Sequence, residues 1–115
     1  MLTSAESPID VAPVDFIEMG RDTNSRVDQA AIERSWRERG FSCGLWVDPP
    51  GQVWSDYVHD TDELVMVVEG DVEFDIEGQV HRPAPGEELF IPARARHTVR
   101  NLGRGESRWL YGYRR

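Results

Sequence analysis

The sequence predicts an all-β protein, a closed sandwich or barrel of jelly-roll type, preceded by an extended arm and one short helix. Three observations support this fold class. From Phe41 onward, apolar residues recur with a period of two, as side chains do along strands. A β-branched apolar run follows at 64–68, and Gly or Pro interrupts the chain at short intervals. Closing the sheets also removes exposed strand edges.

The first forty residues have a different character. Residues 11–19 suggest a short extended arm, and a polar loop follows. A helix is predicted from Asp28 to Arg39, with Asp28 as its N-cap, Ile32 and Trp36 on one face and Gly40 as its stop. We therefore assign 1–40 to an arm and short helix and 41–115 to the barrel. A length of 115 residues fits one domain.

The strand pattern begins with alternating apolar residues at 41–47, where Cys43 is expected to be a small core residue. Gly70-Asp71 and Glu77-Gly78 predict tight turns of an antiparallel meander. Shorter strands, one of them carrying His81 near the surface, complete the barrel. The main predicted strands are 41–47, 53–59, 64–68, 72–76, 89–91, 97–100 and 108–113.

Charge and cysteine content limit the classes of partner. The net charge is −8 and all thirteen basic residues are arginines, so nucleic acid and anionic lipid are poor partners. The single Cys43 excludes an internal disulfide and fits a reducing cytoplasm. We find neither an export signal nor about 18 consecutive apolar residues, so we expect a cytoplasmic protein without a membrane span.

Arginines gather after residue 93, whereas acidic residues dominate 56–88. The simplest interpretation is charge pairing within or between chains, and the alternative is an anionic ligand that contacts one or two of the arginines. Trp54 and Val58 should project from the outer face of their strand. Together with the arm at 11–19, they predict a homodimer that buries this face.

His59 and Glu63 lie four residues apart, directly before the apolar run at 64–68. The β-branched run argues against a helix, so a helical face cannot bring the pair together. If His59 ends one strand and Glu63 begins its hairpin partner, their Cβ atoms lie roughly 5 Å apart. This geometry suits a metal ligand pair.

Two stretches resemble the signature motifs of the cupin superfamily. The first spans 51–70 and keeps the family spacing of Gly, five residues, His-x-His, three or four residues, Glu, six residues and Gly, with tyrosine in place of the first histidine. The second spans 86–101 and keeps Gly, five residues, Pro-x-Gly, two residues, His, three residues and Asn, with arginine in place of the middle glycine. From the start of the first to the end of the second, residues 51–101, they span close to half of the chain. The corresponding residues are Gly51, Tyr57, His59, Glu63 and Gly70, then Gly86, Pro92, Arg94, His97 and Asn101.

The resemblance implies that His59, Glu63 and His97 are metal ligands. Two imidazoles and one carboxylate suit Fe(II), Mn(II), Ni(II) or Zn(II) and leave coordination positions open. Three roles are open for Tyr57: a phenolate ligand, a hydrogen-bonding group at a metal-bound water or substrate, or a filler of a metal-free barrel. Arg94 either binds a substrate carboxylate at the barrel mouth or is simply solvated.

Cupins include oxygenases, isomerases and lyases as well as sensing domains, so the fold leaves function open. The leading hypothesis is a small metal-dependent enzyme that acts on an oxygen-rich small molecule, with Tyr57 as proton donor or orienting group. The alternative is a non-catalytic binding or sensing barrel in which Tyr57 fills the metal position. A third class is a structural protein whose cavity is filled by side chains. Asp56, Asp60 and Asp62 flank the site and are expected to have no direct role.

Overall fold

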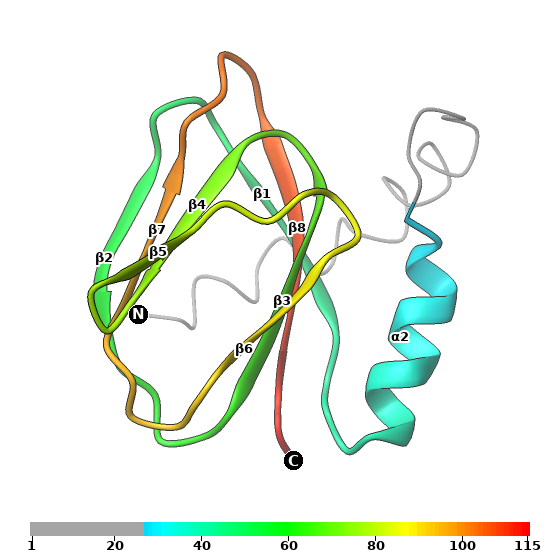
Figure 1. The fold of residues 1–115 in the computed structure, drawn as a ribbon. Coiled ribbons are helices and arrows are strands. Elements are labelled where there is room, and N and C mark those ends of the chain that lie inside the picture. The colour runs from blue at the N-terminus through cyan, green and yellow to red at the C-terminus, as the bar shows by residue number, and fades with distance from the viewer. Residues whose placement is uncertain (1–26) are drawn as a thin grey trace.

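The computed structural model describes residues 27–115, which form one helix and eight strands in two four-stranded antiparallel sheets (Figure 1). The predicted arm at 11–19 lies outside the described residues. The two sheets face each other as in a jelly roll, which confirms the all-β fold with a short helix. The elements are α2 (Gln29–Glu38), β1 (Gly44–Asp48), β2 (Val53–Tyr57), β3 (Glu63–Glu69), β4 (Val72–Ile76), β5 (Gln79–His81), β6 (Glu88–Ile91), β7 (His97–Asn101) and β8 (Ser107–Tyr113).

Helix α2 begins and ends where the sequence predicts. The Asp28 side chain accepts a hydrogen bond from the Ala31 N–H at 3.1 Å, as an N-cap does. At the other end the backbone of Gly40 has φ +90°, a left-handed conformation that glycine adopts without a steric penalty.

The sheet topology corrects the predicted meander. One sheet has the order β1-β8-β3-β6 and the other β2-β7-β4-β5, so β2 and β3 are not hairpin partners. The turn at Gly70-Asp71 likewise crosses from one sheet to the other. Glu77-Gly78 does close a hairpin, between β4 and β5, with positive φ at both residues. Local turn signals cannot tell a hairpin from a crossing between sheets, because long-range pairing with β6, β7 and β8 decides the partner.

Strand β3 is buried on both faces, which explains its unbroken apolar run. Val65 and Val67 point into the barrel, while Leu64, Met66 and Val68 point outward beneath helix α2. Two cores result. The inner core, between the sheets, contains Trp46, Val65, Val67, Val72, Phe74, Ile91, Ala95, Val99, Trp109 and Tyr111. The outer core, between α2 and the sheet, contains Trp36, Phe41, Leu45, Leu64, Met66, Val68 and Leu110.

Cys43 packs at the edge of the outer core, as predicted for a small core residue. Burial raises the pKa of its thiol to about 12. The thiolate, which is the reactive form of cysteine, is therefore scarce at neutral pH.

Helix α2 is fastened to the barrel by one carboxylate on β6. The indole Nε1 of Trp36 donates to Glu88 at 3.0 Å, and the guanidinium of Arg39 donates to both Glu88 oxygens at 2.9 and 2.7 Å. The hydrogen bond from Arg39 is the main cause that lowers the pKa of Glu88. A bidentate pair of this kind fixes orientation as well as position.

The predicted charge pairing of the C-terminal arginines is confirmed within the chain. Arg100 pairs with Glu73 at 2.7 Å, Arg114 with Asp62 at 3.1 Å, and Arg108 with Glu69 at 3.6 Å. Arg94 is exposed and has φ +68°, which explains why a glycine suits this position.

Strand β2 contains an irregularity that overturns the predicted outward position of Trp54. The register with β7 shifts between Trp54 and Tyr57, and Asp56 in the bulge has φ +57°. The extra residue turns Trp54 toward the barrel interior, where it packs on the inner core. The homodimer thereby loses one of its supporting observations and stays a prediction.

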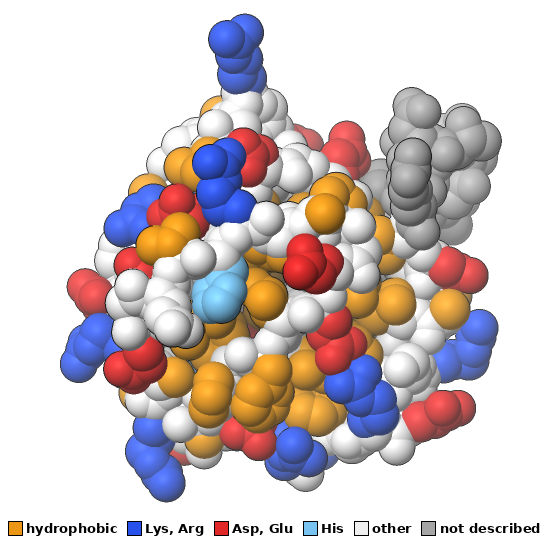
Figure 2. All heavy atoms as spheres, viewed as in Figure 1, with side chains coloured by type: hydrophobic (Ala, Val, Ile, Leu, Met, Phe, Trp, Pro, Cys, Tyr) orange, Lys and Arg blue, Asp and Glu red, His pale blue; other side chains and the backbone are white. Residues whose placement is uncertain are grey.

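Apolar side chains nevertheless gather on the face that carries β5 and β6 (Figure 2). They include Val80 and Phe90, which are 57% and 49% exposed.

Within residues 27–115, no helix has both the length and the apolar character needed to cross a membrane.

We expect Gly112→Ala to lower the free energy of unfolding by about 2 to 4 kcal/mol. A Cβ atom on Gly112 would lie 2.0 Å from the backbone oxygen of Ser42 and 2.9 Å from Cε3 of Trp36. Gly105→Ala is the control, because its Cβ meets nothing within 4 Å. Urea denaturation measures both variants, and equal stabilities would contradict this account of the close approach.

We expect Glu88→Gln to lower the free energy of unfolding at pH 7 by about 1 kcal/mol. Since the folded state lowers the pKa of Glu88 below its ordinary value of 4.5, the ionised carboxylate stabilises the fold above pH 4.5. That contribution is lost as the pH falls through the folded-state pKa. The difference between variant and unmodified protein should therefore shrink below pH 4.5 in denaturation curves.

Glu33→Gln provides the control on the same helix, because the ion pair that Glu33 forms within residues 27–115 is with exposed Arg37 at i+4. Its effect should stay within about 0.5 kcal/mol. A Glu88→Gln effect that does not change with pH would mean that the charge is not what fastens the helix.

Candidate metal centre

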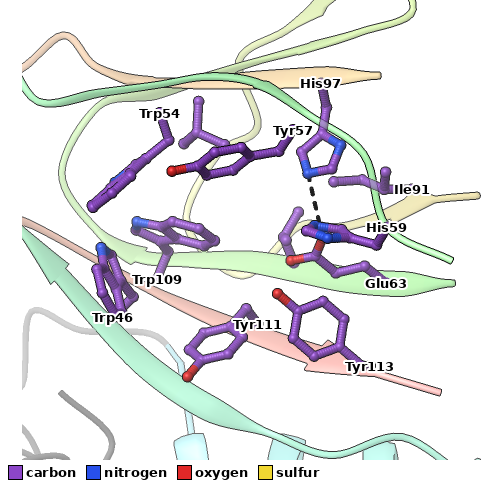
Figure 3. Close-up of a pocket in the computed structure, with 12 residues that line it drawn as sticks. Trp46, Trp54, Tyr57, His59, Glu63, Ile91, His97, Trp109, Tyr111 and Tyr113 are labelled. Carbon is purple, nitrogen blue, oxygen red and sulfur yellow. Dashed lines mark ion pairs between the residues drawn. The ribbon is translucent and has the colours of Figure 1, made fainter. Parts of the chain in front are cut away.

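Three side chains that could ligate a metal ion meet at one end of the barrel interior (Figure 3). His59 follows β2, Glu63 is the first residue of β3, and His97 is the first residue of β7. The Nε2 atom of His59 lies 3.2 Å from Oε1 of Glu63, and that of His97 lies 3.6 Å from the same oxygen. One candidate ligand atom from each residue lies within 4.8 Å of the other two. We call these three residues the ligand set.

The two motif-bearing loops hold the ligand set together through their backbones. The Arg94 N–H donates to the carbonyl of His59 at 2.6 Å, and the Ala93 N–H donates to the Asp62 carboxylate at 2.8 Å. The Asp62 carboxylate also accepts from Nε of Arg114 at 3.1 Å. The Ala93 N–H, followed by Arg114, lowers the pKa of Asp62. Asp62 therefore organises the loop beside Glu63.

The imidazole of His97 is oriented for ligation. Its Nδ1 lies 3.0 Å from the carbonyl oxygen of Ala95. Because a carbonyl only accepts, Nδ1 carries the proton in this hydrogen bond, and Nε2 is the ring atom that could ligate a metal. A partner of this kind behind a histidine ligand fixes both tautomer and ring orientation.

The burial and the donor atoms of the ligand set suit a metal ion. Glu63 is 3% exposed and His97 is 4% exposed. Within residues 27–115, neither Oε1 of Glu63 nor Nε2 of His59 has a hydrogen-bond partner, although both are buried. Such buried polar atoms are costly unless something satisfies them. A divalent cation shared by the three side chains would do so, and their N and O donors suit a transition metal.

Tyr57 lies beside the ligand set, opposite His97 in the pairing of β2 with β7. Its ring centroid is 6.5 Å from that of His59 and 6.4 Å from that of His97. Figure 3 shows its hydroxyl directed away from the ligand set, toward the tryptophans. Burial raises the pKa of this phenol, which favours its neutral form. The predicted catalytic role of Tyr57 stays a prediction.

Tyr113 was not singled out by the sequence analysis. Its ring centroid is 5.2 Å from that of His59, and Figure 3 shows its hydroxyl directed toward Glu63 and His59. Trp109, Tyr111 and Tyr113 alternate on β8 and face the cavity together. Their spacing by two in the sequence indicates one face of a strand, but it does not indicate that this face lines a cavity.

The ligand set forms one end of a cavity lined almost entirely by aromatic and aliphatic side chains. The space between the lining side chains, counted together with the solvent at its open mouth, is about 410 Å³. The other lining residues are Trp46, Trp54, Tyr57, Val65, Ile91, Val99, Trp109, Tyr111 and Tyr113.

Other candidate residues lie away from the ligand set. Asp56 and Asp60 are exposed, and His81 lies on β5 outside the cavity. Asn101 ends the second motif in a structural role, because its side-chain amide donates to backbone carbonyls of Pro49 and Gly105 at 2.9 and 3.0 Å.

Comparisons with known proteins agree with this architecture. The family model for the cupin domain matches residues 44–113. The chain is 37% identical over 73 residues to a Streptomyces cyaneus protein named polyketide synthase CurC, covering 63% of this chain and 47% of that protein. It is 36% identical over 73 residues to protein SchB of Streptomyces halstedii, covering 63% of this chain and 52% of that protein.

The chain thus spans about half the length of the curated relatives it matches. Among solved structures, a salicylate 1,2-dioxygenase from Pseudaminobacter salicylatoxidans superposes with a TM-score of 0.61 at 22% identity. That match covers 65% of this chain and 22% of the dioxygenase. At this identity the similarity shows the fold alone.

Proposed function

The chain belongs to the cupin domain family, and from this premise we propose that it binds one divalent transition metal and acts on a small, oxygen-rich organic molecule. One observation carries the proposal. The buried carboxylate oxygen of Glu63 faces two imidazole nitrogens, and within residues 27–115 neither it nor Nε2 of His59 is satisfied by a hydrogen bond. Iron, manganese, nickel and zinc all suit such a donor set.

His59, Glu63 and His97 would hold the ion. When bound, it would supply a Lewis acid that polarises a substrate oxygen or lowers the pKa of a coordinated water. The side chains around it exclude water and orient the substrate. Tyr57 and Tyr113 bring the phenol hydroxyls that can hold or donate a proton in the cavity, and the Tyr113 hydroxyl is the one directed toward the ligand set.

The relatives support a substrate of the polyketide type. One of them is named a polyketide synthase, and a polyketide chain carries repeated carbonyl or hydroxyl oxygens along an apolar backbone. The cavity pairs a ligand set for oxygens with apolar and aromatic walls. We therefore propose a metal-dependent enzyme that acts on a polyketide-derived molecule.

One observation favours a second candidate, a non-catalytic binding or sensing barrel. Tyr57 stands where the family motif has a histidine, and its hydroxyl points away from the ligand set. In that case the ring fills the barrel in place of a metal ligand. A protein that binds no divalent metal but still binds a small molecule in the cavity would favour this alternative.

We expect the unmodified protein, purified without tag or chelator, to bind about one divalent metal per chain. His97→Ala should weaken binding by about a hundredfold or more, since it removes one of three ligands. His81→Ala is the matched control, because His81 lies outside the cavity. Elemental analysis and isothermal titration calorimetry measure the two variants.

Metal should also raise the melting temperature, because it binds the folded state. If zinc, nickel, manganese and Fe(II) all leave both the titration and the melting temperature unchanged, the metal proposal is wrong.

We expect Tyr57→His to tighten metal binding by about tenfold, or about 1.4 kcal/mol. A neutral imidazole is a better ligand than a neutral phenol, and the side chain stands opposite His97. Tyr57→Phe should leave metal affinity unchanged, because the phenol is not directed at the ligand set. A strong loss of affinity in Tyr57→Phe would instead identify the phenolate as a ligand.

A further inference from the structure

Asp48, the last residue of β1, is 1% exposed and contacts three tryptophans that line the end of the cavity away from the ligand set (Figure 3). Its carboxylate accepts hydrogen bonds from three indole N–H groups. Trp54 donates to Oδ1 at 3.0 Å, Trp109 donates to Oδ2 at 3.1 Å, and Trp46 also donates to Oδ1. These tryptophans come from β2, β8 and β1, so the carboxylate links both sheets.

The charge of Asp48 is balanced by dipoles. Over residues 27–115, no arginine or histidine forms an ion pair with it. Burial raises the pKa of Asp48, and the hydrogen bonds from the three tryptophans oppose that shift. An arrangement of three donors around one carboxylate fixes the orientation of all three rings at once.

This arrangement determines what the cavity can offer a ligand. We call Trp46, Trp54 and Trp109 the tryptophan wall. Because an indole has a single N–H donor and Asp48 receives all three, the wall presents only ring faces and edges to the cavity. The ligand set presents nitrogen and oxygen donors at the other end (Figure 3). The cavity is therefore polar at one end and aromatic at the other.

Two rings of the wall, Trp46 and Trp54, pack directly against each other. The centroids of Trp46 and Trp54 are 5.4 Å apart at an interplanar angle of 74°, an edge-to-face contact. A planar ligand would thus lie against the wall. Aromatic contacts of this kind contribute binding free energy in addition to that from the apolar area that they bury.

We propose that Asp48 is a positioning residue that fixes the tryptophan wall, and that the cavity consequently selects a planar aromatic ring over a saturated one. Oxygen substituents of the ring, such as adjacent hydroxyl or carbonyl groups, face the ligand set, and its unsubstituted edge lies on the wall. The position of the oxygens rests on the proposed function. The preference for a ring rests on the wall alone.

The first experiment compares two probes on the metal-free full chain, because catechol is far more acidic than a saturated diol and would bind zinc more tightly for that reason alone. Catechol and trans-1,2-cyclohexanediol both carry two adjacent hydroxyls, but only catechol is planar and aromatic. By calorimetry we expect catechol to bind at least about tenfold more tightly. Equal binding of the two probes, or tighter binding of tetramethylammonium than of catechol, would overturn the proposal. The second outcome would instead identify the wall as a cation site.

The second experiment uses the four tryptophans as reporters. In a ¹⁵N-HSQC spectrum we expect Asp48→Asn to shift three indole N–H signals and to leave Trp36, which donates to Glu88, in place. Glu88→Gln is the matched control and should shift only Trp36. Asp48→Asn should reduce the preference for catechol at least about fivefold without changing zinc affinity. An unchanged preference despite three shifted signals would show that Asp48 does not set selectivity.

Two further measurements keep the outcomes distinct. If Asp48→Asn does not fold, Trp54→Phe takes its place, because it keeps a ring but removes one N–H donor. An unchanged preference in a folded Trp54→Phe would count against the proposal.

If zinc does not bind, the proposed function fails, but 2-naphthol should still bind the metal-free protein more tightly than decahydro-2-naphthol. Equal binding of these two probes would contradict the proposal that the tryptophan wall prefers an aromatic ring.

Discussion

The alternation of side chains along β8 is the constraint on which the rest of the structure depends. Trp109, Tyr111 and Tyr113 point into the barrel, whereas Leu110 and Gly112 lie toward helix α2. A one-residue slip of this strand would exchange the two sets, placing aromatic rings against the helix and a glycine in the cavity. The register of one central strand thus fixes both the helix packing and the cavity.

The two ends of the cavity satisfy buried carboxylates in different ways. Asp48 accepts three neutral indole N–H groups and forms no ion pair in the described chain. Glu63 instead faces two imidazoles, without a hydrogen bond to its Oε1 in that same part of the chain. The Asp48 carboxylate therefore has its hydrogen-bond donors among the described residues, whereas Oε1 of Glu63 has none there. This contrast separates scaffold from site more clearly than burial does, because both residues are almost fully buried.

Much of this architecture could be predicted from the sequence, and the predictions that were wrong or missing have identifiable physical reasons. The apolar period of two located the strands, the Asp28 cap located the helix, and motif spacing brought His59, Glu63 and His97 together before any coordinates. Partition of the strands between two sheets could not be predicted, because it depends on pairing between distant segments. The orientation of Trp54 was wrong, since a bulge adds one residue to the count without a Gly or Pro to mark it. Asp48 was missed because its three partners come together only in the folded chain.

The bulge at Asp56 has a consequence for how this scaffold can be varied. It separates β2 into an upstream part that carries Trp54 and a downstream part that carries Tyr57 and leads to His59. Because the extra residue absorbs the change of register, the two parts address opposite ends of one cavity without sharing a regular pleat. Residues at the two ends can therefore vary independently along a single strand, so that a substitution in the tryptophan wall need not disturb the geometry of the ligand set.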